Sequence, residues 1–476
     1  MFGPTVAFLK YVTNLLPSLG HRNIRQMTLR DWMESRLSES TVIAQTDRHI
    51  HGLVTRNRKP TQLEERAELY KGSRAMAELL ERFVDERKRD VLQGATSILA
   101  PTTELNRKVV LPKADVIQLA REALNRPWNS ARRVFANDAV NALQKRAGLG
   151  RTGIDLAPIV ENAIASFWPQ LRFAQEYRRF LKNTGRLISL GRESVDSDLA
   201  AALAMSIGND AEPFNSTDLP ALLYLDRLLN LHPKQGFQHI VVDEAQDVSP
   251  MEILLLKQDS SNGSFTIMGD IRQSLFPHRG IKQWREITTL FQRTEYVQYE
   301  SPVSYRSTAQ ITRFANRILR QLPGGSSNPP EAYHREGLAP TFVMAPNNEA
   351  MISAIAKQVQ SLRPGRDVTV AVLHRWARDR GVIAKGLTAC GVEDVTTLES
   401  GEPMRSKVVV GPVIVAKGLE FDAVILAGVN DSNYLDEEFD TRLLYLGCTR
   451  ARHELHFHWS GRLAQSLIVA KGQRSV

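Results

Sequence analysis

The feature that most constrains this chain is the run His-Ile-Val-Val-Asp-Glu-Ala-Gln-Asp at residues 239–247. Its apolar, β-branched residues predict a short buried strand, with Asp243 and Glu244 at the carboxyl end. Open parallel α/β sheets bind their ligands at that edge. One carboxylate there can hold Mg²⁺ on the phosphates of a nucleotide, and a second can polarise an attacking water. Two acids alone could simply cap a strand, but the whole run favours nucleotide chemistry.

A second informative segment lies shortly downstream. The strand-like run Phe265-Thr-Ile-Met ends in Gly269-Asp270, and the chain continues Ile-Arg-Gln-Ser-Leu-Phe-Pro-His-Arg-Gly through residue 280. Taken alone, such an ending is an ordinary turn. Together with residues 239–247 it resembles motifs II and III of the superfamily 1 UvrD-like helicases, whose consensus reads Asp-Glu-x-Gln-Asp and then Gly-Asp-x-x-Gln-Ser-Ile-Tyr-x-x-Arg-Gly.

Three later segments continue this resemblance in the order of the family. Residues 305–307 (Tyr-Arg-Ser) are similar to motif IV, residues 416–422 (Ala-Lys-Gly-Leu-Glu-Phe-Asp) to motif V, and residues 443–451 (Leu-Leu-Tyr-Leu-Gly-Cys-Thr-Arg-Ala) to motif VI. Five motifs in one order are very unlikely to arise by chance. The resemblance implies an ATP-dependent motor that uses ATP and Mg²⁺.

The resemblance also implies roles for residues in motifs II and III. Asp243 would hold the metal ion, and Glu244 would be the general base that activates water. Gln246 and Gln273 are similar to the glutamines that sense the γ-phosphate and couple hydrolysis to domain movement. Asp270 falls among the nucleotide-binding positions of motif III.

Motifs IV to VI would complete the nucleotide site from a second domain. Tyr305 would stack near the adenine, Glu420 would contact the ribose, and Gly418 would lie beside the nucleotide. Arg306 and Arg450 would stabilise charge on the transferred phosphoryl group, because a charged transition state needs fixed cations. The alternative for either arginine is a surface salt bridge.

Motif III also carries the residues expected to contact nucleic acid. Phe276 keeps an aromatic side chain on which a base can stack. His278 replaces the tryptophan or other aromatic residue of some helicases, which weakens direct strand tracking. Arg279 completes the expected nucleic-acid contacts.

The order of strand-like and helical patterns indicates an α/β fold with two RecA-like P-loop NTPase domains, the first incomplete, and a helical insertion. We expect residues 1–60 to form part of the first domain, called 1A, and residues 61–225 a mostly helical, basic insertion without clear strands. Residues 226–300 would return to domain 1A with motifs II and III. Residues 301–476 would form domain 2A, with strand-like runs at 341–344, 368–373, 406–415, 422–427 and 454–458.

One expected element is missing from this sequence. A phosphate-cradling loop needs Gly-x-x-x-x-Gly-Lys-Ser/Thr, and no Gly-Lys dipeptide occurs in the 476 residues. Residues 2–20 resemble the segment that follows the Walker A helix in HelD-like proteins, so we expect the loop to lie outside this sequence. A fragment, a misplaced start site, a split gene and a degenerate paralogue are all compatible with this. A separate chain could supply the loop, and whether this chain hydrolyses ATP by itself stays open.

Within the family, the chain is most similar to the HelD group, the helicase IV-like motors that act on RNA polymerase. The stretch between Arg306 and Lys417 is too short for the second large insertion of UvrD and Rep relatives, and Gly-Pro-Val-Ile-Val at 411–415 replaces the usual Thr and His before motif V. The expected function is therefore ATP-driven remodelling of RNA polymerase–nucleic acid complexes. The alternatives are a 3′→5′ DNA helicase of the UvrD type and an ATPase-dead module that binds nucleic acid or polymerase.

Charge and cysteine content set the expected surroundings. The net charge is +9, and residues 91–190 hold 15 basic and 7 acidic side chains. Such a stretch favours binding to a polyanion or to an acidic protein partner, although a solvated helical face without a partner would have the same charge composition. Two cysteines, Cys390 and Cys448, cannot form a disulfide framework, and no apolar run is long enough to span a membrane. A cytoplasmic protein with DNA or RNA polymerase as its partner is expected.

Overall fold

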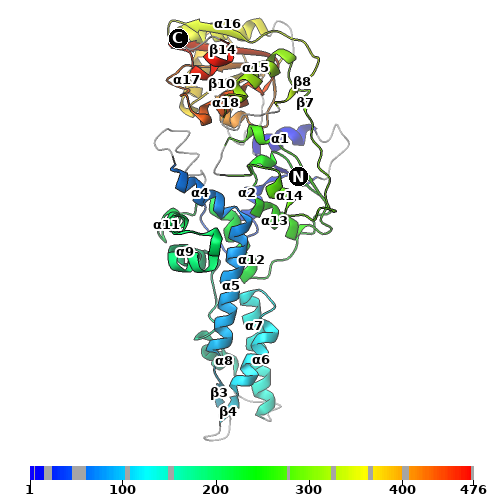
Figure 1. Cartoon of the computed structure of the whole chain (residues 1–476), viewed down its shortest axis with the longest axis vertical. Helices are drawn as coiled ribbons and strands as arrows, with labels where there is room; N and C mark the ends of the chain where they lie inside the picture. Colours follow the sequence, from blue (N-terminus) through cyan, green and yellow to red (C-terminus); the bar gives the residue numbers. More distant parts are fainter. Residues whose placement is uncertain are drawn as a thin grey trace.

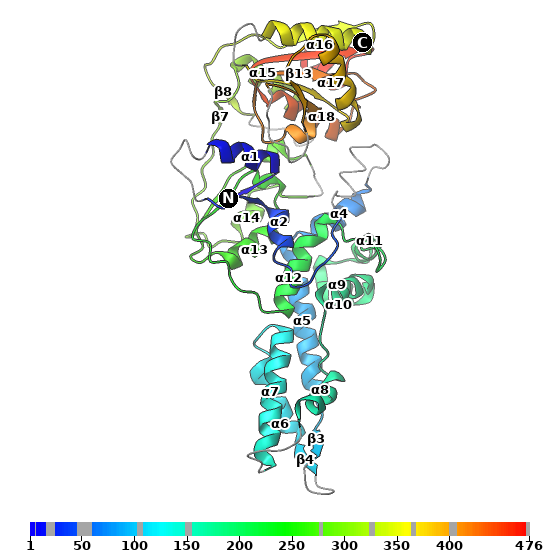
Figure 2. The same cartoon turned by 180° about the vertical axis from the view of Figure 1, so that it is seen from behind.

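The computed structural model describes residues 1–4, 6–15, 24–44, 60–101, 108–147, 155–275, 279–322, 329–362, 368–398 and 407–472. Two α/β lobes lie one above the other, and a long, mainly helical projection extends from the first lobe away from the second (Figures 1 and 2). In the described part of the chain, no helix combines the length and apolar character that crossing a membrane requires.

The first lobe is built on a parallel four-stranded sheet in the order β2-β1-β5-β6. Residues from the start of the chain and from the acidic run share this sheet, because Phe2 pairs with Val242 and Ile240 pairs with Phe265. Its elements are β1 (Phe2–Gly3), α1 (Val6–Leu15), β2 (Met27–Thr28), α2 (Leu29–Glu34), β5 (Ile240–Val242), η4 (Ala245–Asp247), α13 (Pro250–Asp259), β6 (Phe265–Ile267), η5 (Ile271–Gln273) and α14 (Arg285–Thr288).

The insertion between β2 and β5 is mainly helical. Its elements are α4 (Gln62–Lys71), α5 (Arg74–Gly94), β3 (Ile98–Pro101), β4 (Lys108–Leu111), α6 (Lys113–Ala123), α7 (Trp128–Arg146), α8 (Ala157–Ala165), α9 (Phe173–Lys182), α10 (Thr184–Gly191), η2 (Arg192–Ser194), α11 (Ser197–Ser206), η3 (Ser216–Asp218) and α12 (Leu219–Leu229). We call α5 to α8 with β3 and β4 the arm, and Figure 1 shows the β3–β4 hairpin at its far end.

The helices of the insertion begin where the sequence provides caps. Thr61 and Glu64 form a capping box at the start of α4, and the Ser73 side chain accepts a hydrogen bond from the Met76 backbone N–H at the start of α5. The apolar residues of α5 form one stripe that joins a hydrophobic core continuous from Phe2 in the first lobe to Ile164 in the arm. The arm and the first lobe therefore share one core.

The insertion also contains two short strands, although its sequence shows no clear alternating pattern. β3 and β4 form an antiparallel hairpin in which Ile98 faces Leu111 and Leu99 faces Val110. Each strand has only four residues, so the alternation of buried and exposed positions is too short to stand out in the sequence. At the exposed face of the hairpin, 56% of Leu99 and 40% of Val110 are accessible.

The second lobe is built on a parallel six-stranded sheet in the order β11-β12-β10-β13-β14-β9. Its elements, with the preceding β7–β8 pair, are β7 (Val303–Ser304), α15 (Ala309–Leu319), β8 (Glu331–Ala332), β9 (Thr341–Ala345), α16 (Asn348–Leu362), β10 (Val370–His374), η6 (Ala377–Asp379), α17 (Arg380–Ala389), β11 (Val395–Thr397), β12 (Val408–Pro412), η7 (Val413–Ala416), β13 (Phe421–Ala427), α18 (Glu438–Cys448), β14 (Ala451–Ser460) and α19 (Gln465–Ala470). The five strand-like runs expected in this region correspond to β9, β10, β12, β13 and β14.

Two buried histidines predict how the second lobe responds to acid. His374 and His458 lie on the sheet face covered by α16 and α17, and burial lowers the pKa of each from 6.5 to about 4. The unfolded chain therefore binds more protons below pH 6.5, so stability falls as the pH falls toward 4. Lowering the pH from about 7 to about 5.5 should reduce the free energy of unfolding by about 1 kcal/mol per histidine.

Denaturant unfolding of the full chain at the two pH values measures this loss. His458→Leu should make the pH dependence shallower. His239→Leu, in which the replaced ring is exposed and bonded to Ser264 and Thr266, should not. A slope that is the same in both variants would contradict the assignment.

Candidate nucleotide-binding cleft

Asp243 and Glu244 follow β5 at the carboxyl edge of the first sheet. Glu244 adopts a left-handed backbone conformation with φ +54°, and its N–H donates to Asp243 Oδ1 at 2.8 Å. A non-glycine residue in this region is costly and tends to be kept where function needs it. Burial raises the pKa of Asp243 although the nearby Arg306 opposes the shift.

A chain of hydrogen bonds runs from Glu244 across the sheet edge. Gln246 Nε2 donates to Glu244 Oε2 at 2.5 Å, and Gln246 Oε1 accepts from the Asp270 backbone N–H at 2.9 Å. Asp270 Oδ2 then accepts from Gln273 Nε2 at 3.0 Å. Gly269 permits this path, because a Cβ at that position would come within 2.4 Å of Gln246 Oε1. Motifs II and III are thus linked into one network.

Arg450 connects this network to the second lobe. Its Nη2 donates to Gln273 Oε1 at 2.6 Å. The arginine is buried, with 1% of its surface exposed. Burial and the neighbouring charge of Arg306 lower the pKa of Arg450 to about 10, while Glu244 and Glu420 oppose the shift. Arg306 itself pairs with Glu420 at 2.5 Å. The structure therefore brings acids of one lobe close to guanidinium groups of the other where the two lobes meet.

The remaining predicted nucleotide-binding residues lie at the border of the second lobe. Tyr305 is 62% exposed, and its ring contacts that of Tyr333 with centroids 4.8 Å apart. Gly418 has φ +80°, and a Cβ there would lie 2.9 Å from the ring of Phe8 in α1. Glycine is required at this position by both the backbone conformation and the close approach of the first lobe.

Two further charged residues connect the lobes, although the sequence motifs did not suggest a role for either of them. Lys417 Nζ lies 2.5 Å from Asp247 Oδ2 and donates to the Gln273 backbone carbonyl at 3.3 Å. Arg442 Nη1 donates to the Ser274 backbone carbonyl at 3.2 Å. Lys417 and Asp247 both stand inside the motif runs, but nothing in the sequence indicates that they face each other.

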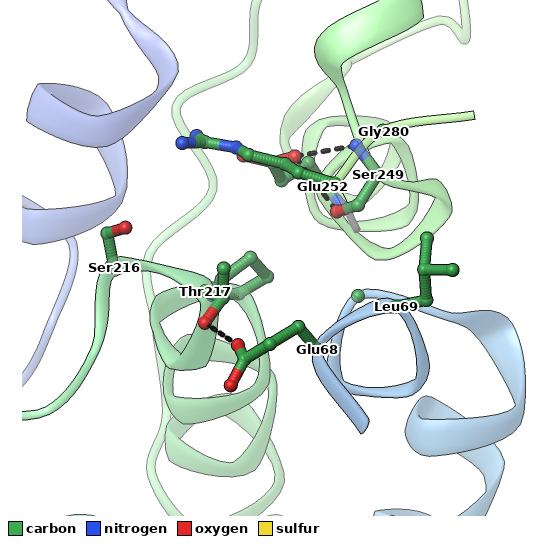
Figure 3. A pocket seen from close by; sticks show the side chains of 10 residues that line it. Glu68, Leu69, Ser216, Thr217, Ser249, Glu252 and Gly280 are labelled. Carbon is green, nitrogen blue, oxygen red and sulfur yellow. Dashed lines mark hydrogen bonds between the residues drawn. The ribbon is translucent and has the colours of Figure 1, made fainter. Parts of the chain in front are cut away.

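A separate pocket lies behind motif II, between α4, the start of α12, the start of α13 and Gly280 (Figure 3). Gly280 has φ +81° and packs on the backbone of Gln246 and Asp247, where a Cβ would lie 2.1 Å from the Gln246 carbonyl oxygen. Arg279 lines this pocket. Phe276 and His278, the other residues expected to contact nucleic acid, lie outside the described residues.

The acids at this sheet edge could serve a metal ion that a nucleotide also helps to hold. Among the described residues, no group of three or more His, Cys, Asp or Glu side chains is placed to hold a metal ion. Mg²⁺ on a nucleotide needs only one or two carboxylates, since phosphate oxygens and water complete its shell. Asp243 could offer such a carboxylate, and Arg306 and Arg450 lie close enough to interact electrostatically with Asp243 and Glu244, respectively.

Two family models match the parts of the chain that form this cleft. The UvrD/REP helicase N-terminal domain matches residues 172–288, and the UvrD-like helicase C-terminal domain matches residues 407–457. These ranges include the acids and glutamines of the first lobe and Lys417, Glu420 and Arg450 of the second. The chain thus contains an N-terminal and a C-terminal UvrD-like helicase domain, matched over these two ranges.

Individual relatives are similar only in part. DNA helicase IV of Escherichia coli is 24% identical over 236 residues, covering 46% of this chain and 33% of the relative. UvrD2 of Mycobacterium tuberculosis is 28% identical over 166 residues, covering 33% of this chain and 23% of the relative. The solved C-terminal domain of a possible DNA helicase from Lactobacillus plantarum is 34% identical, with 35% of this chain and 94% of that chain covered and a TM-score of 0.30. The chain spans a third or less of these two curated relatives.

Proposed function

We propose that this chain is the motor portion of an ATP-dependent DNA helicase or translocase of the UvrD type, with two RecA-like lobes. Residues 1–60 and 226–300 would form the first lobe, 301–476 the second, and 61–225 the insertion. The observation that carries the proposal is the hydrogen-bond chain from Glu244 through Gln246, Asp270 and Gln273 to Arg450. It links the acids on one side of the cleft to an arginine on the other, as coupling between catalysis and lobe movement requires.

The residues of the cleft have distinct roles in this proposal. Bound Mg²⁺–ATP supplies the phosphoryl group and the metal charge. Asp243 would hold the metal ion, and Glu244 would accept a proton from the attacking water. Arg306 and Arg450 stabilise negative charge in the transition state because they are already fixed in place, Arg450 by burial and Arg306 by Glu420.

The base and sugar of the nucleotide would be held at the border of the second lobe. Tyr305 offers an exposed ring supported by Tyr333, and Glu420 lies next to Arg306 to receive the ribose. Gly418 lets the backbone approach closely. Gln246 and Gln273 would report the state of the γ-phosphate through Asp270, which bonds to both.

The proposed site also needs a phosphate-cradling loop, and the sheet offers a place for it. β6 is an edge strand with one neighbour among the described residues. A strand added parallel to β6 would end at the same edge as Asp243 and Asp270, so a following Gly-rich loop would lie beside them. A separate polypeptide carrying such a strand and loop is a proposed partner.

The 476-residue chain alone is therefore expected to hydrolyse ATP at close to the background rate, because positioning of the phosphates supplies most of phosphoryl-transfer catalysis. Adding a strand–loop–helix segment with a Walker A sequence, fused or in trans, should restore DNA-stimulated turnover. A coupled ATPase assay measures both rates. Fast turnover by the chain alone would contradict the need for the added loop.

Unwinding is tested by strand displacement on a partial duplex with a 3′ tail, using the chain supplied with the loop. Displacement that needs ATP and is lost in the Arg450→Ala variant supports a DNA helicase. ATP turnover without displacement, on several duplexes, would contradict it.

Action on RNA polymerase is the second candidate, and the slender arm favours it. The arm carries the exposed pair Leu99 and Val110 at its far end, near Lys108 and the basic end of α7. An apolar tip with basic flanks suits insertion into an acidic channel of a large assembly. Copurification with RNA polymerase that is lost in the Leu99→Asp variant would support this second function, and binding unaffected by the variant would contradict it.

A further inference from the structure

Lys417 is buried between the lobes, far from its partners in the sequence. The residue is 5% exposed, and its ammonium group contacts Asp247, which lies 170 positions earlier in the chain. It follows η7 in the second lobe, whereas Asp247 ends η4 in the first lobe. The contact therefore joins the end of motif II to motif V.

We propose that Lys417 is a positioning residue that fixes Gln273 against Arg450, so that the motif III segment moves with the second lobe. This inference rests on the proposed function and adds a residue to its coupling machinery. Lys417 binds the backbone carbonyl of Gln273, while Arg450 binds the side-chain oxygen of the same residue. Two cations of the second lobe thus hold one residue of the first.

A third cation of the second lobe binds the next residue of the first lobe. Arg442 binds the backbone carbonyl of Ser274, which directly follows Gln273. Arg442 also pairs with Glu438 one helical turn away in α18, so its charge keeps a partner when the lobes separate. Arg450 is proposed to act on the phosphoryl group. In the described part of the chain, the ammonium group of Lys417 bonds only to first-lobe atoms, which makes it the cation most dependent on contact between the lobes.

The charge pairing explains why this contact would fix the arrangement of the lobes. An unpaired charge at a buried position is costly, so Lys417 and Asp247 favour the arrangement in which they meet. Asp247 Oδ1 is buried and has no hydrogen-bond partner among the described residues. Lys417 is thus the cation that pairs with the Asp247 carboxylate. Removing the ammonium group would leave that carboxylate unpaired next to the motif II acids.

The arrangement of the lobes can be measured without any ATP turnover. Spin labels at the exposed Cys390 of the second lobe and at an introduced Asn262→Cys of the first lobe report the distance between lobes, because Cys448 is buried. In the full chain, we expect Lys417→Met to broaden or shift this distance distribution. Lys417→Arg, which keeps the charge, should preserve it. Lys385→Met, which removes an exposed lysine from α17 of the same lobe, should leave it unchanged.

A second readout separates positioning from general damage. In the chain supplied with a phosphate loop, Lys417→Met should lower kcat about tenfold or more, because misplacement of catalytic groups reduces the chemical step. KM for ATP should change less than about twofold, since Lys417 is not placed on the nucleotide, and Lys417→Arg should recover most of kcat.

The outcomes distinguish this inference from the proposed function. If Lys417→Met alters the lobe distances but the loop-supplied chain never hydrolyses ATP, the proposed function fails while the link between the lobes stands. If ATP turnover is restored and Lys417→Met changes neither kcat nor the distances, the inference is overturned and the proposed function stands. Equal effects of Lys417→Met and Lys385→Met would also overturn the inference.

Discussion

In the chain supplied with a phosphate loop, Glu244→Gln should reduce ATP turnover about 10²–10⁴-fold while nucleotide binding is retained. Glutamine keeps the size of the side chain and can still accept the hydrogen bond from Gln246, but it cannot take a proton from water. Single-turnover hydrolysis and binding of a fluorescent nucleotide measure the two quantities separately.

The control replaces a carboxylate by an amide at a site far from the cleft. Glu349→Gln changes an exposed residue in the first turn of α16 and should leave the turnover at its original value. An unchanged rate in Glu244→Gln would exclude this residue as the general base. A loss of nucleotide binding equal to the loss of rate would assign Glu244 to binding instead.

The second large effect concerns stability. Lys71→Met is expected to lower the free energy of unfolding by about 3–5 kcal/mol, because it leaves buried carboxylates without their cation. Lys71 is fully buried and lies 3.0 Å from Glu68 Oε1 and 2.9 Å from Asp218 Oδ1. Burial alone would lower the pKa of Lys71, but the two carboxylates raise it overall. Tyr177 donates to Asp218, so the cluster links α4, α9 and η3.

Denaturant unfolding of the full chain measures this cost. Lys145→Met, which removes an exposed lysine from the last turn of α7, should change stability by less than about 0.5 kcal/mol. The triple variant Lys71→Met, Glu68→Gln, Asp218→Asn should recover part of the loss because it removes the unpaired charges. If Lys71→Met costs no more than Lys145→Met, the cluster does not stabilise the insertion.

A shared location for the acids of motifs II and III could be predicted because strand ends determine where their side chains lie. Asp243 and Asp270 follow neighbouring parallel strands, so they meet at one edge of the sheet whatever the rest of the chain does. Arg306 and Arg450 come from the other lobe, and only the family resemblance placed them opposite the acids. The left-handed conformation of Glu244 could not be predicted from the sequence, because a glutamate does not by itself indicate a φ of +54°.

Contacts that depend on tertiary packing could not be predicted. The pair Lys417–Asp247 forms because the two lobes face each other, and no local pattern reports that distance. Lys71 stands in a segment that the sequence indicates only as helical, and its pairing depends on η3, which brings Asp218 beside it. The β3–β4 hairpin was missed because its strands are too short for a periodic signal.

The core shared by the arm and the first lobe has a mechanical consequence. Since Phe2 and Ile164 belong to one packed interior, the arm should behave as a rigid lever and not as a tethered module. α5 has 21 residues and is therefore about 30 Å long. Tilting the first lobe by about 10° would move the hairpin by about 5 Å. A small rotation of the lobe would therefore produce a larger displacement at the tip of the arm.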